Sequence, residues 1–259
     1  MPNDKPMIFS APMVRALLDG RKTMTRQILR NVPQPPDDTI HPAYVDRPVR
    51  EKPYVDSYCS QPHTRLNPRG VSNVWCWWTR DNRCGASFKV NFVPGMRLWV
   101  RETFADVNSG YGPGIGYKAD GDFYQPEYDG PDEGAGPSYN YDKYPGDYTM
   151  WYSDLLSGSP GHKWRSPIHM PRWASRITLI VTGVTVERLN DISEADAWAE
   201  GVSYLSHGTT RSESEGRALY AMLWDSIHGD GAWALNPWVA AISFNVEKRN
   251  IDEVASNAA

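Results

Sequence analysis

The stretch Arg176–Val202, RITLIVTGVTVERLNDISEADAWAEGV, joins two different periodic patterns and indicates the class of the fold. Aliphatic residues recur at every second position from Ile177 to Val181, and again at Val184 and Val186 beyond Gly183. A period of two is typical of β-strands, so this part predicts two strands, or one strand bent at the glycine. The second part resembles a capped helix that ends at Gly201. The stretch therefore predicts a strand followed by a short helix.

Outward from this stretch, the same patterns predict elements near both ends of the chain. A short strand at 7–9 precedes a helix that begins after Ser10, carries Pro12 in its first turn and ends at Gly20. The alternation of Thr23 and Thr25 predicts a further strand.

The remaining predicted elements lie in the middle and in the last third of the chain. The runs MRLWVRETFA at 96–105 and NPWVAAISFNVEKR at 236–249 alternate as strands do. A longer helix begins between Ser212 and Glu215, and we expect it to bury an apolar face. That predicted face consists of Leu219, Met222, Leu223 and Ile227. The tail beyond Asn250 is expected to fray.

Two long segments interrupt these elements. The first, about 31–93, is rich in proline, which excludes long regular elements. The second, about 107–162, is rich in tyrosine and poor in aliphatic residues. Between Lys118 and Asp154 it has nine acidic residues and two lysines, a local charge of −7. Both segments are predicted to be irregular insertions in one domain whose core is about 7–30, 94–106 and 163–249.

Composition limits the class of protein. The chain has 259 residues and a formal net charge of −4, and it contains no apolar run long enough to span a bilayer. We therefore expect a cytoplasmic protein with no membrane partner. Its cysteines, Cys59, Cys76 and Cys84, form no paired disulfide framework. Free thiols are the favoured interpretation, and a Cys3His zinc site that includes His63 is the alternative.

Four blocks together resemble the ASCH-domain family, and most closely the long members from bacteriophages and prophages. The blocks are FSAPMVRALLDGRKTMTRQIL, PGMRLWVRETF, HMPRWASRITLIVTGVTVERLNDISEADAWAEGV and LWDSIHGDGAWALNPWVAAISF. They occur in the expected order, although Met96 stands where long phage members usually have aspartate. The two insertions have no such match.

The resemblance implies an α+β fold: a small, mixed, PUA-like β-barrel with flanking helices and a cleft beside the first helix. It also implies a ligand that is RNA or a nucleoside or nucleotide, in a phage or prophage protein within a bacterial host. Small family members hydrolyse the acetyl group of N4-acetylcytidine with a G-R-K-x-x-T run and a distant glutamate. Here Lys22 and Thr25 match the run, and Glu200 matches the glutamate.

The chemistry of these three residues suits amide hydrolysis, which needs a base or nucleophile, an oxyanion donor and an acid. Lys22 can stabilise an oxyanion or act as a base or nucleophile, and the Thr25 hydroxyl can bind substrate or water. Glu200 can carry the proton to the leaving amine. The alternative for Lys22 is an exposed cation that complements the helix C-terminus, and Glu200 can equally be a solvent-exposed residue.

A basic stretch at 162–176 interleaves cations with Trp164 and Trp173 and contains no acid. Such a stretch can hold phosphate and stack a base, although it can equally be an ordinary strand start with buried tryptophans. The predicted substrate-binding residues are Arg21, Arg26, Arg101, Glu102, Arg172, Trp173 and Arg176. We expect the acidic segment to be attracted to the basic cleft as a lid; the alternative is that it faces away from the cleft and only aids solubility.

No P-loop, nucleophile elbow or H-E-x-x-H zinc motif is present, so we expect no cofactor and no catalytic metal. Two classes of function remain open. One is an amidohydrolase that acts on N4-acylated cytidine. The other is a nucleic-acid-binding phage regulator without catalysis, and ribonuclease activity is a third alternative.

Overall fold

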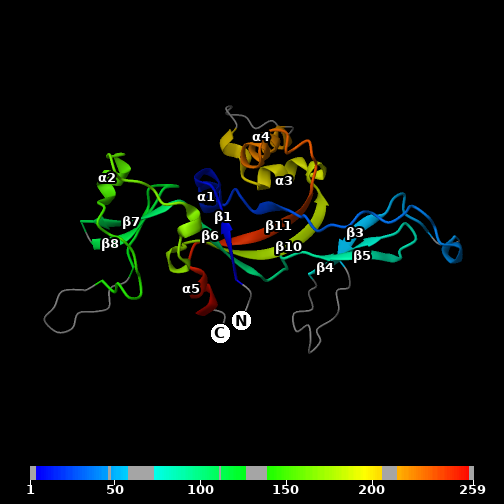
Figure 1. Ribbon diagram of the computed structural model, residues 1–259, viewed down its shortest axis with the longest axis horizontal. Coiled ribbons are helices and arrows are strands. Elements are labelled where there is room, and N and C mark those ends of the chain that lie inside the picture. The colour runs from blue at the N-terminus through cyan, green and yellow to red at the C-terminus, as the bar shows by residue number, and fades with distance from the viewer. Residues whose placement is uncertain are drawn as a thin grey trace. The chain divides into compact units, whose positions relative to one another are not determined.

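The computed structural model describes residues 4–45, 48–57, 73–110, 112–126, 139–205 and 215–256. It is a mixed α+β structure with several small sheets and few helices (Figure 1). The strands are β1 Lys5–Ile8, β2 Met24–Ile28, β3 Tyr54–Ser57, β4 Val74–Trp78, β5 Cys84–Lys89, β6 Arg97–Arg101, β7 Phe104–Ser109, β8 Gly112–Tyr117, β9 Phe123–Tyr124, β10 Thr178–Arg188 and β11 Trp238–Glu247. The helices are α1 Ala11–Leu18, α2 Tyr152–Leu156, α3 Glu194–Ala199, α4 Gly216–His228 and α5 Ile251–Ser256. None of the described helices is long and apolar enough to cross a membrane.

The strands form three sheets, of which the largest has the order β1-β6-β10-β11-β2. In it β1 and β6 are parallel, whereas β11 and β2 are antiparallel with Thr25 opposite Ile242. The order begins at β1 and ends at β2, and the described strands form no closed barrel. The α+β class is therefore confirmed, and the PUA-like assignment stays a prediction.

The chain divides into two compact units. The first unit consists of 1–20, 97–179 and 246–259, and the second consists of 21–96 and 180–245. The boundaries differ from the predicted division into core and insertions, because each unit contains one insertion and part of the predicted core. The assignment of the whole chain to one domain stays a prediction.

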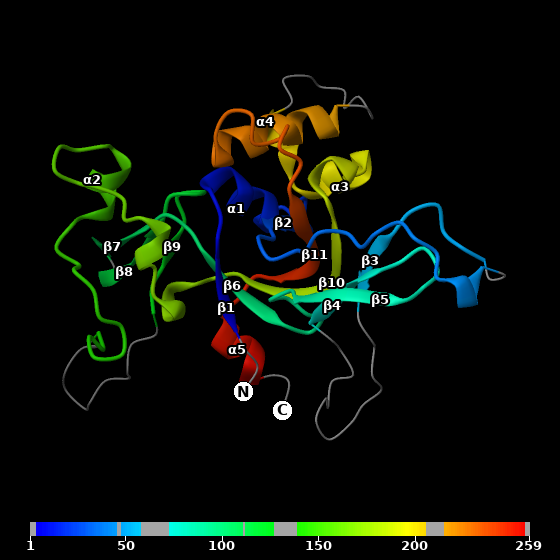
Figure 2. The same ribbon diagram turned by 45° about the vertical axis from the view of Figure 1, so that its right-hand side comes forward.

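In the second unit, α3 and α4 pack against each other on one side of β10 and β11 (Figure 2). The strand predicted from the alternation is one continuous strand through Gly183. The predicted cap is confirmed, since the Ser193 hydroxyl accepts the Asp196 N–H at 3.0 Å. Gly201 has a φ of +84°, in the left-handed region that glycine favours, directly after the helix.

The buried face of α4 differs from the predicted one. Met222 and Ile227 are exposed, while Tyr220, Leu223 and Trp224 are buried. The prediction was wrong because it followed aliphatic residues alone, whereas a helix buries whichever large side chains recur at its i, i+3 and i+4 positions.

The first insertion is not irregular. Three antiparallel strands, β3, β4 and β5, lie side by side in it (Figure 2). The central strand, VWCWW, consists of β-branched and aromatic residues together with one cysteine, which favour a pleated surface. The described prolines of this segment lie outside its strands and therefore do not interrupt the ladder.

The second insertion, in the first unit, also forms part of a sheet of β7, β8 and β9. The strand β7 begins at Phe104 within the predicted core, because the run predicted as one strand at 96–105 is divided into β6 and β7. Its glycines allow close packing, because the ring of Phe123 covers Gly114 and the ring of Tyr152 covers Gly116, with no room for a Cβ at either position. The prediction of an irregular segment was therefore wrong for the described residues. Small residues here permit aromatic packing in place of an aliphatic pattern.

The tail after Asn250 was expected to fray, but its described part forms the helix α5, and residues 257–259 lie outside the described residues. The side chain of Asn250 accepts the Asp252 N–H at 2.9 Å, and Ile251 is fully buried. A side-chain acceptor at the start of a helix satisfies a main-chain donor that lacks a partner within the helix.

Candidate functional site

The residues Lys22 and Glu200 meet in a buried ion pair in the second unit. The Lys22 Nζ donates to Glu200 Oε2 at 2.7 Å and to the Glu200 carbonyl oxygen at 2.9 Å. Lys22 is 0% exposed and Glu200 is 2% exposed. The neighbouring backbone joins the two segments, because the Thr23 N–H donates to the Ala199 carbonyl at 2.9 Å. This bond fixes the segment before β2 against the end of α3 and places the two side chains in contact.

Arg26 on β2 binds three carboxylates around the same point. Its Nε donates to Glu187 at 2.9 Å, its Nη1 to Glu200 at 3.1 Å and its Nη2 to Asp196 at 3.2 Å. Burial alone lowers the pKa of Arg26, but the charges of Glu200 and Glu187 outweigh burial and raise it. The guanidinium therefore stays charged at every pH at which the protein is folded.

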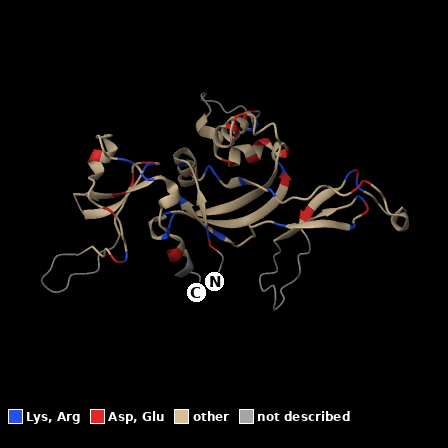
Figure 3. Ribbon diagram, in the orientation of Figure 1, with Lys and Arg blue, Asp and Glu red and all other residues tan. Residues whose placement is uncertain are grey.

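Tyr220 completes this group, which we call the Lys22 cluster: Lys22, Arg26, Glu187, Asp196, Glu200 and Tyr220. The Tyr220 hydroxyl donates to Glu200 Oε1 at 3.3 Å. Burial, together with the charge of Glu200, raises the pKa of Tyr220 well above its usual value. The cluster thus contains two cations and three carboxylates, and Figure 3 shows acidic segments on α3 and at the end of β10.

Three members of the cluster, Glu187, Asp196 and Tyr220, were not predicted. Asp196 lies in the first turn of α3 and Glu200 caps its C-terminal end, four residues further on. Lys22 and Arg26 are also four residues apart. Acids at i and i+4 share one face of a helix, so this matched spacing is the signal that sequence reasoning missed.

Thr25 lies on β2 next to Arg26 and is buried. Successive side chains of a strand point to opposite faces of the sheet, so Thr25 faces away from the side on which Arg26 binds its carboxylates. The structure therefore brings together two members of the predicted catalytic triad, and the role of Thr25 stays a prediction.

Arg21 and Arg26 belong to the second unit, and the other predicted substrate-binding residues belong to the first. Arg21 Nη1 donates to the Ser203 hydroxyl at 2.6 Å. Arg101 stacks over the Trp99 ring at 4.5 Å, and Trp173 packs edge-on against Tyr144 at 5.1 Å.

Arg176 binds three carboxylates in what we call the Arg176 cluster: Arg176, Glu102, Asp120 and Asp122. Glu102 and Asp120 each accept from two guanidinium nitrogens at 2.8–3.0 Å, and Asp122 accepts at 3.0 Å. Burial raises the pKa of Glu102 although Arg176 opposes this shift. Asp120 and Asp122 belong to the acidic segment, so part of that segment does bind a cation of the basic stretch.

The other arginines of the basic stretch are paired as well. Arg172 binds Asp4 and Asp252 at 2.6–2.7 Å, and Arg165 binds the buried Asp106. The sequence predicted cations that are free to hold phosphate. These carboxylate partners, which come from distant parts of the chain, instead satisfy all three arginines in this conformation.

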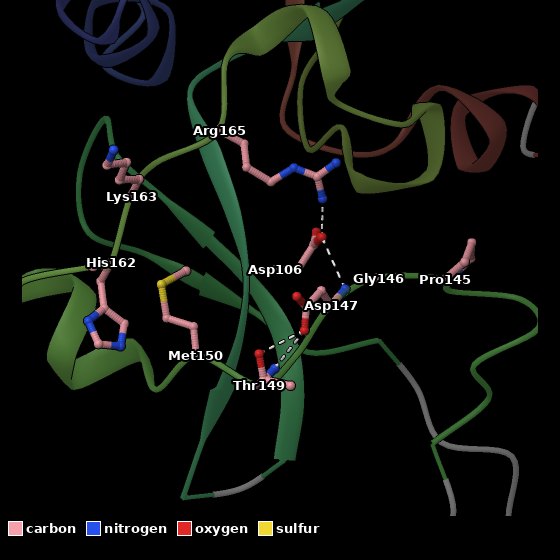
Figure 4. Close-up of a pocket in the computed structure, with 10 residues that line it drawn as sticks. Asp106, Pro145, Gly146, Asp147, Thr149, Met150, His162, Lys163 and Arg165 are labelled. Atoms are coloured by element: carbon pink, nitrogen blue, oxygen red, sulfur yellow. Dashed lines mark hydrogen bonds and ion pairs between the residues drawn. The ribbon is translucent and has the colours of Figure 1, made fainter.

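A pocket of about 760 Å³ lies in the first unit beside this stretch (Figure 4). Its lining includes Asp106, Asp147, His162, Lys163 and Arg165. Figure 4 shows that the side chains of His162, Lys163 and Arg165 leave one segment in different directions. Burial raises the pKa of Asp106 although Arg165 opposes this shift. The pocket is polar, but its cations do not converge on one point as they would around a phosphate.

The zinc alternative is only partly within the described residues. Cys76 and Cys84 are free cysteines, while Cys59 and His63 lie outside the described residues. Within the described ranges, no group of three or more histidine, cysteine, aspartate or glutamate side chains is placed to hold a metal ion.

Comparison with known proteins gave no match: neither a protein-family model, nor a curated protein, nor a solved structure matches this chain.

Proposed function

We propose that this protein is a PUA-like, ASCH-domain protein that binds a nucleoside, nucleotide or RNA segment and hydrolyses an N-acyl amide such as that of N4-acetylcytidine. The observation that carries the proposal is the 2.7 Å contact between Lys22 and Glu200, which are 178 residues apart in the chain. These are two of the three residues that the resemblance assigns to catalysis. At this distance a proton can pass directly between the Lys22 amine and the Glu200 carboxylate.

The reaction begins with that exchange. Transfer of a proton from the Lys22 ammonium to the Glu200 carboxylate gives a neutral amine and a neutral acid, a pair that a buried site tolerates. The amine then takes a proton from a water molecule as the water oxygen attacks the amide carbonyl. The resulting Lys22 ammonium stabilises the oxyanion of the tetrahedral intermediate.

Collapse of the intermediate restores the starting state. The carbon–nitrogen bond breaks, and the Glu200 carboxyl group donates its proton to the leaving amine. The products are a carboxylic acid and the free amine, with Lys22 and Glu200 again charged. Arg26 and Tyr220 act as positioning residues in this scheme, because they hold Glu200 through its other carboxylate oxygen, Oε1.

One observation favours the non-catalytic alternative. Lys22 and Glu200 are buried and already bonded to protein groups, so a substrate reaches them only if the residues that cover them move. Buried ion pairs whose hydrogen bonds are all made within the protein also occur where they have only a structural role. In that case the chain binds nucleic acid elsewhere and the Lys22 cluster supports the fold.

The test is to incubate the purified chain with N4-acetylcytidine and, separately, with a short RNA, and to follow both by chromatography. We expect cytidine to appear with the wild type and to be lost in Lys22→Arg, which keeps the positive charge but cannot supply a neutral amine. Glu200→Gln should likewise be inactive. Lys89→Ala, which changes an exposed lysine on β5, is the matched control and should retain activity.

The outcomes separate the candidate functions. Release of cytidine at equal rates by the wild type and Lys22→Arg contradicts the assigned pair. Absence of cytidine together with RNA binding supports the regulator, and shortened RNA supports a ribonuclease. Circular dichroism of each variant shows whether a loss of activity is a loss of fold.

A further inference from the structure

Two cysteines of the second unit lie in contact across neighbouring strands. Cys76 on β4 and Cys84 on β5 have their Sγ atoms 3.3 Å apart. The strands shift register at this point: Cys76 is opposite Ser87, whereas Trp78 is opposite Cys84. Because of this register shift, Cys76 and Cys84 are diagonal neighbours on the two strands and not direct partners. Their sulfur atoms are nevertheless in contact.

The two thiols differ in their environment. Cys84 is exposed, and Cys76 is fully buried. Burial, followed by the hydrogen bond with Cys84, raises the pKa of Cys76 to about 12. Cys76 is therefore shielded from solvent, and Cys84 is the thiol that meets a soluble oxidant first.

We infer that Cys76 and Cys84 form a reversible intrachain disulfide when the protein meets hydrogen peroxide. The Cys84 sulfur attacks one peroxide oxygen, the O–O bond breaks, and a sulfenic acid and water form. The Cys76 sulfur then attacks the Cys84 sulfur, the S–O bond breaks, and the hydroxyl group leaves as water with the thiol proton. Two thiols are oxidised by two electrons, and one peroxide is reduced to two molecules of water.

The contact between the sulfur atoms favours the second step over further oxidation, although the raised pKa of Cys76 opposes it because the thiolate is the attacking form. A disulfide needs a sulfur separation of about 2.05 Å, so the two sulfur atoms, which are 3.3 Å apart, must move closer together for the bond to form. Because Cys76 is already in contact, it intercepts the sulfenic acid before a second peroxide can convert it to the irreversible sulfinic form.

The disulfide would constrain strand β4 next to Trp77, which contacts two other segments of the second unit. Trp77, next to Cys76, donates its indole N–H to the Pro33 carbonyl at 2.9 Å and packs edge-on against Trp238 of β11 at 5.4 Å. A disulfide between β4 and β5 constrains the strand that carries this contact. Oxidation should therefore raise the melting temperature by about 5–10 °C and change the tryptophan fluorescence.

The experiment uses the full chain with Cys59→Ser, which leaves only the pair in question. The protein is treated with one equivalent of hydrogen peroxide, alkylated, and digested with trypsin. Because Arg80 and Arg83 lie between the two cysteines, cleavage separates peptide 70–80 from peptide 84–89 unless a disulfide joins them. We expect the joined pair, lighter by two hydrogen atoms than the two peptides together, and its disappearance with dithiothreitol.

Matched controls are Cys76→Ser and Cys84→Ser in the same background. We expect Cys76→Ser to accumulate sulfenic and then sulfinic acid at Cys84, and Cys84→Ser to remain unoxidised at the buried Cys76. Sulfinic acid at Cys84 beside an alkylated Cys76 in the parent protein would overturn the inference. So would zinc that is bound in a one-to-one ratio to the wild type and that protects both thiols until a chelator is added.

Discussion

The Lys22 cluster of the second unit and the Arg176 cluster of the first are both built on an arginine that binds three carboxylates, yet they differ in burial, and only the Lys22 cluster contains a second cation. In the Lys22 cluster the Arg26 side chain is fully buried, and Lys22 shares Glu200 with it. In the Arg176 cluster only Glu102 is fully buried, and the Asp122 side chain is 63% exposed. The first cluster has a buried centre of Lys22, Arg26 and Glu200, with the Glu187 and Asp196 side chains partly exposed around it. The second cluster has one fully buried carboxylate and opens to water at Asp122.

The difference in cations decides what each cluster can do. An arginine remains protonated under all ordinary conditions, whereas a lysine can lose its proton when the environment favours the neutral amine. The Arg176 cluster can therefore hold a loop and a buried carboxylate, but it offers no proton for exchange. Of the two clusters, only the Lys22 cluster has a lysine amine in direct contact with a carboxylate, and this is why the proposed chemistry is placed there.

The largest expected effect comes from Glu200→Leu, which removes the carboxylate shared by Lys22 and Arg26. Two buried cations then lose a partner, so the free energy of unfolding should fall by about 3–5 kcal/mol. Denaturation in urea measures it. Glu247→Leu breaks an ion pair with Arg249 at the surface and should cost less than about 1 kcal/mol. Equal losses in the two variants would contradict the burial of the Lys22 cluster.

The next effect comes from Arg176→Met, which leaves Glu102 buried without its cation. The loss should be about 2–3 kcal/mol at pH 8, because Asp120 and Asp122 can turn to water while Glu102 cannot. The pKa of Glu102 is already raised by burial and rises further without Arg176. Stability from a raised carboxyl pKa is present at low pH and is lost as pH rises through the folded pKa.

The same variant therefore predicts a pH dependence. Unfolding in urea at pH 5 and pH 8 should show a smaller loss at pH 5, where more of Glu102 is protonated. Arg249→Met is the matched control, since its carboxylate partner is partly exposed. A loss that is independent of pH would mean that Glu102 is not the group left uncompensated.

The fold was predictable wherever aliphatic residues alternate or a helix is capped. The long strand β10, the capped helix α3 and the last strand β11 all carry such patterns. The small sheets were missed because their packing uses other residues: aromatic side chains in β4, and glycines covered by aromatic rings in β8. Neither gives an aliphatic period, so a search for that period finds only irregular chain.

The candidate site was also predictable only in part, because its residues come from distant parts of the chain. The contact of Lys22 with Glu200 followed from the resemblance, because no local pattern relates residues so far apart in the chain. The pairing of Arg176 with Asp120 and Asp122 was foreseen only as a general attraction between opposite charges. Which acid binds which arginine depends on the position of the sheet β7-β8-β9, and the sequence did not predict that sheet.

A smaller effect is expected from Tyr220→Phe. The substitution removes one hydroxyl, which donates to Glu200 at 3.3 Å, and leaves the ring packing unchanged. The free energy of unfolding should fall by about 0.5–1.5 kcal/mol, the usual net worth of one hydrogen bond. Trp233→Phe, which alters a ring packed on Tyr220, is the control for ring packing. A loss as large as that of Glu200→Leu would show that the hydroxyl supports the whole Lys22 cluster.

The smallest effects should come from the open side of the Arg176 cluster, where Asp120 and Asp122 can be compared directly. Asp120 accepts from two guanidinium nitrogens and its side chain is 30% exposed, whereas Asp122 accepts from one and is 63% exposed. Asp120→Asn should therefore cost about 1 kcal/mol and Asp122→Asn less than about 0.5 kcal/mol. Raising the salt concentration to about 0.5 M should remove the smaller loss first, since screening acts most strongly on solvated charges. Urea denaturation at low and high salt measures both, and an Asp122→Asn loss that survives high salt would show that water does not reach this side of the cluster.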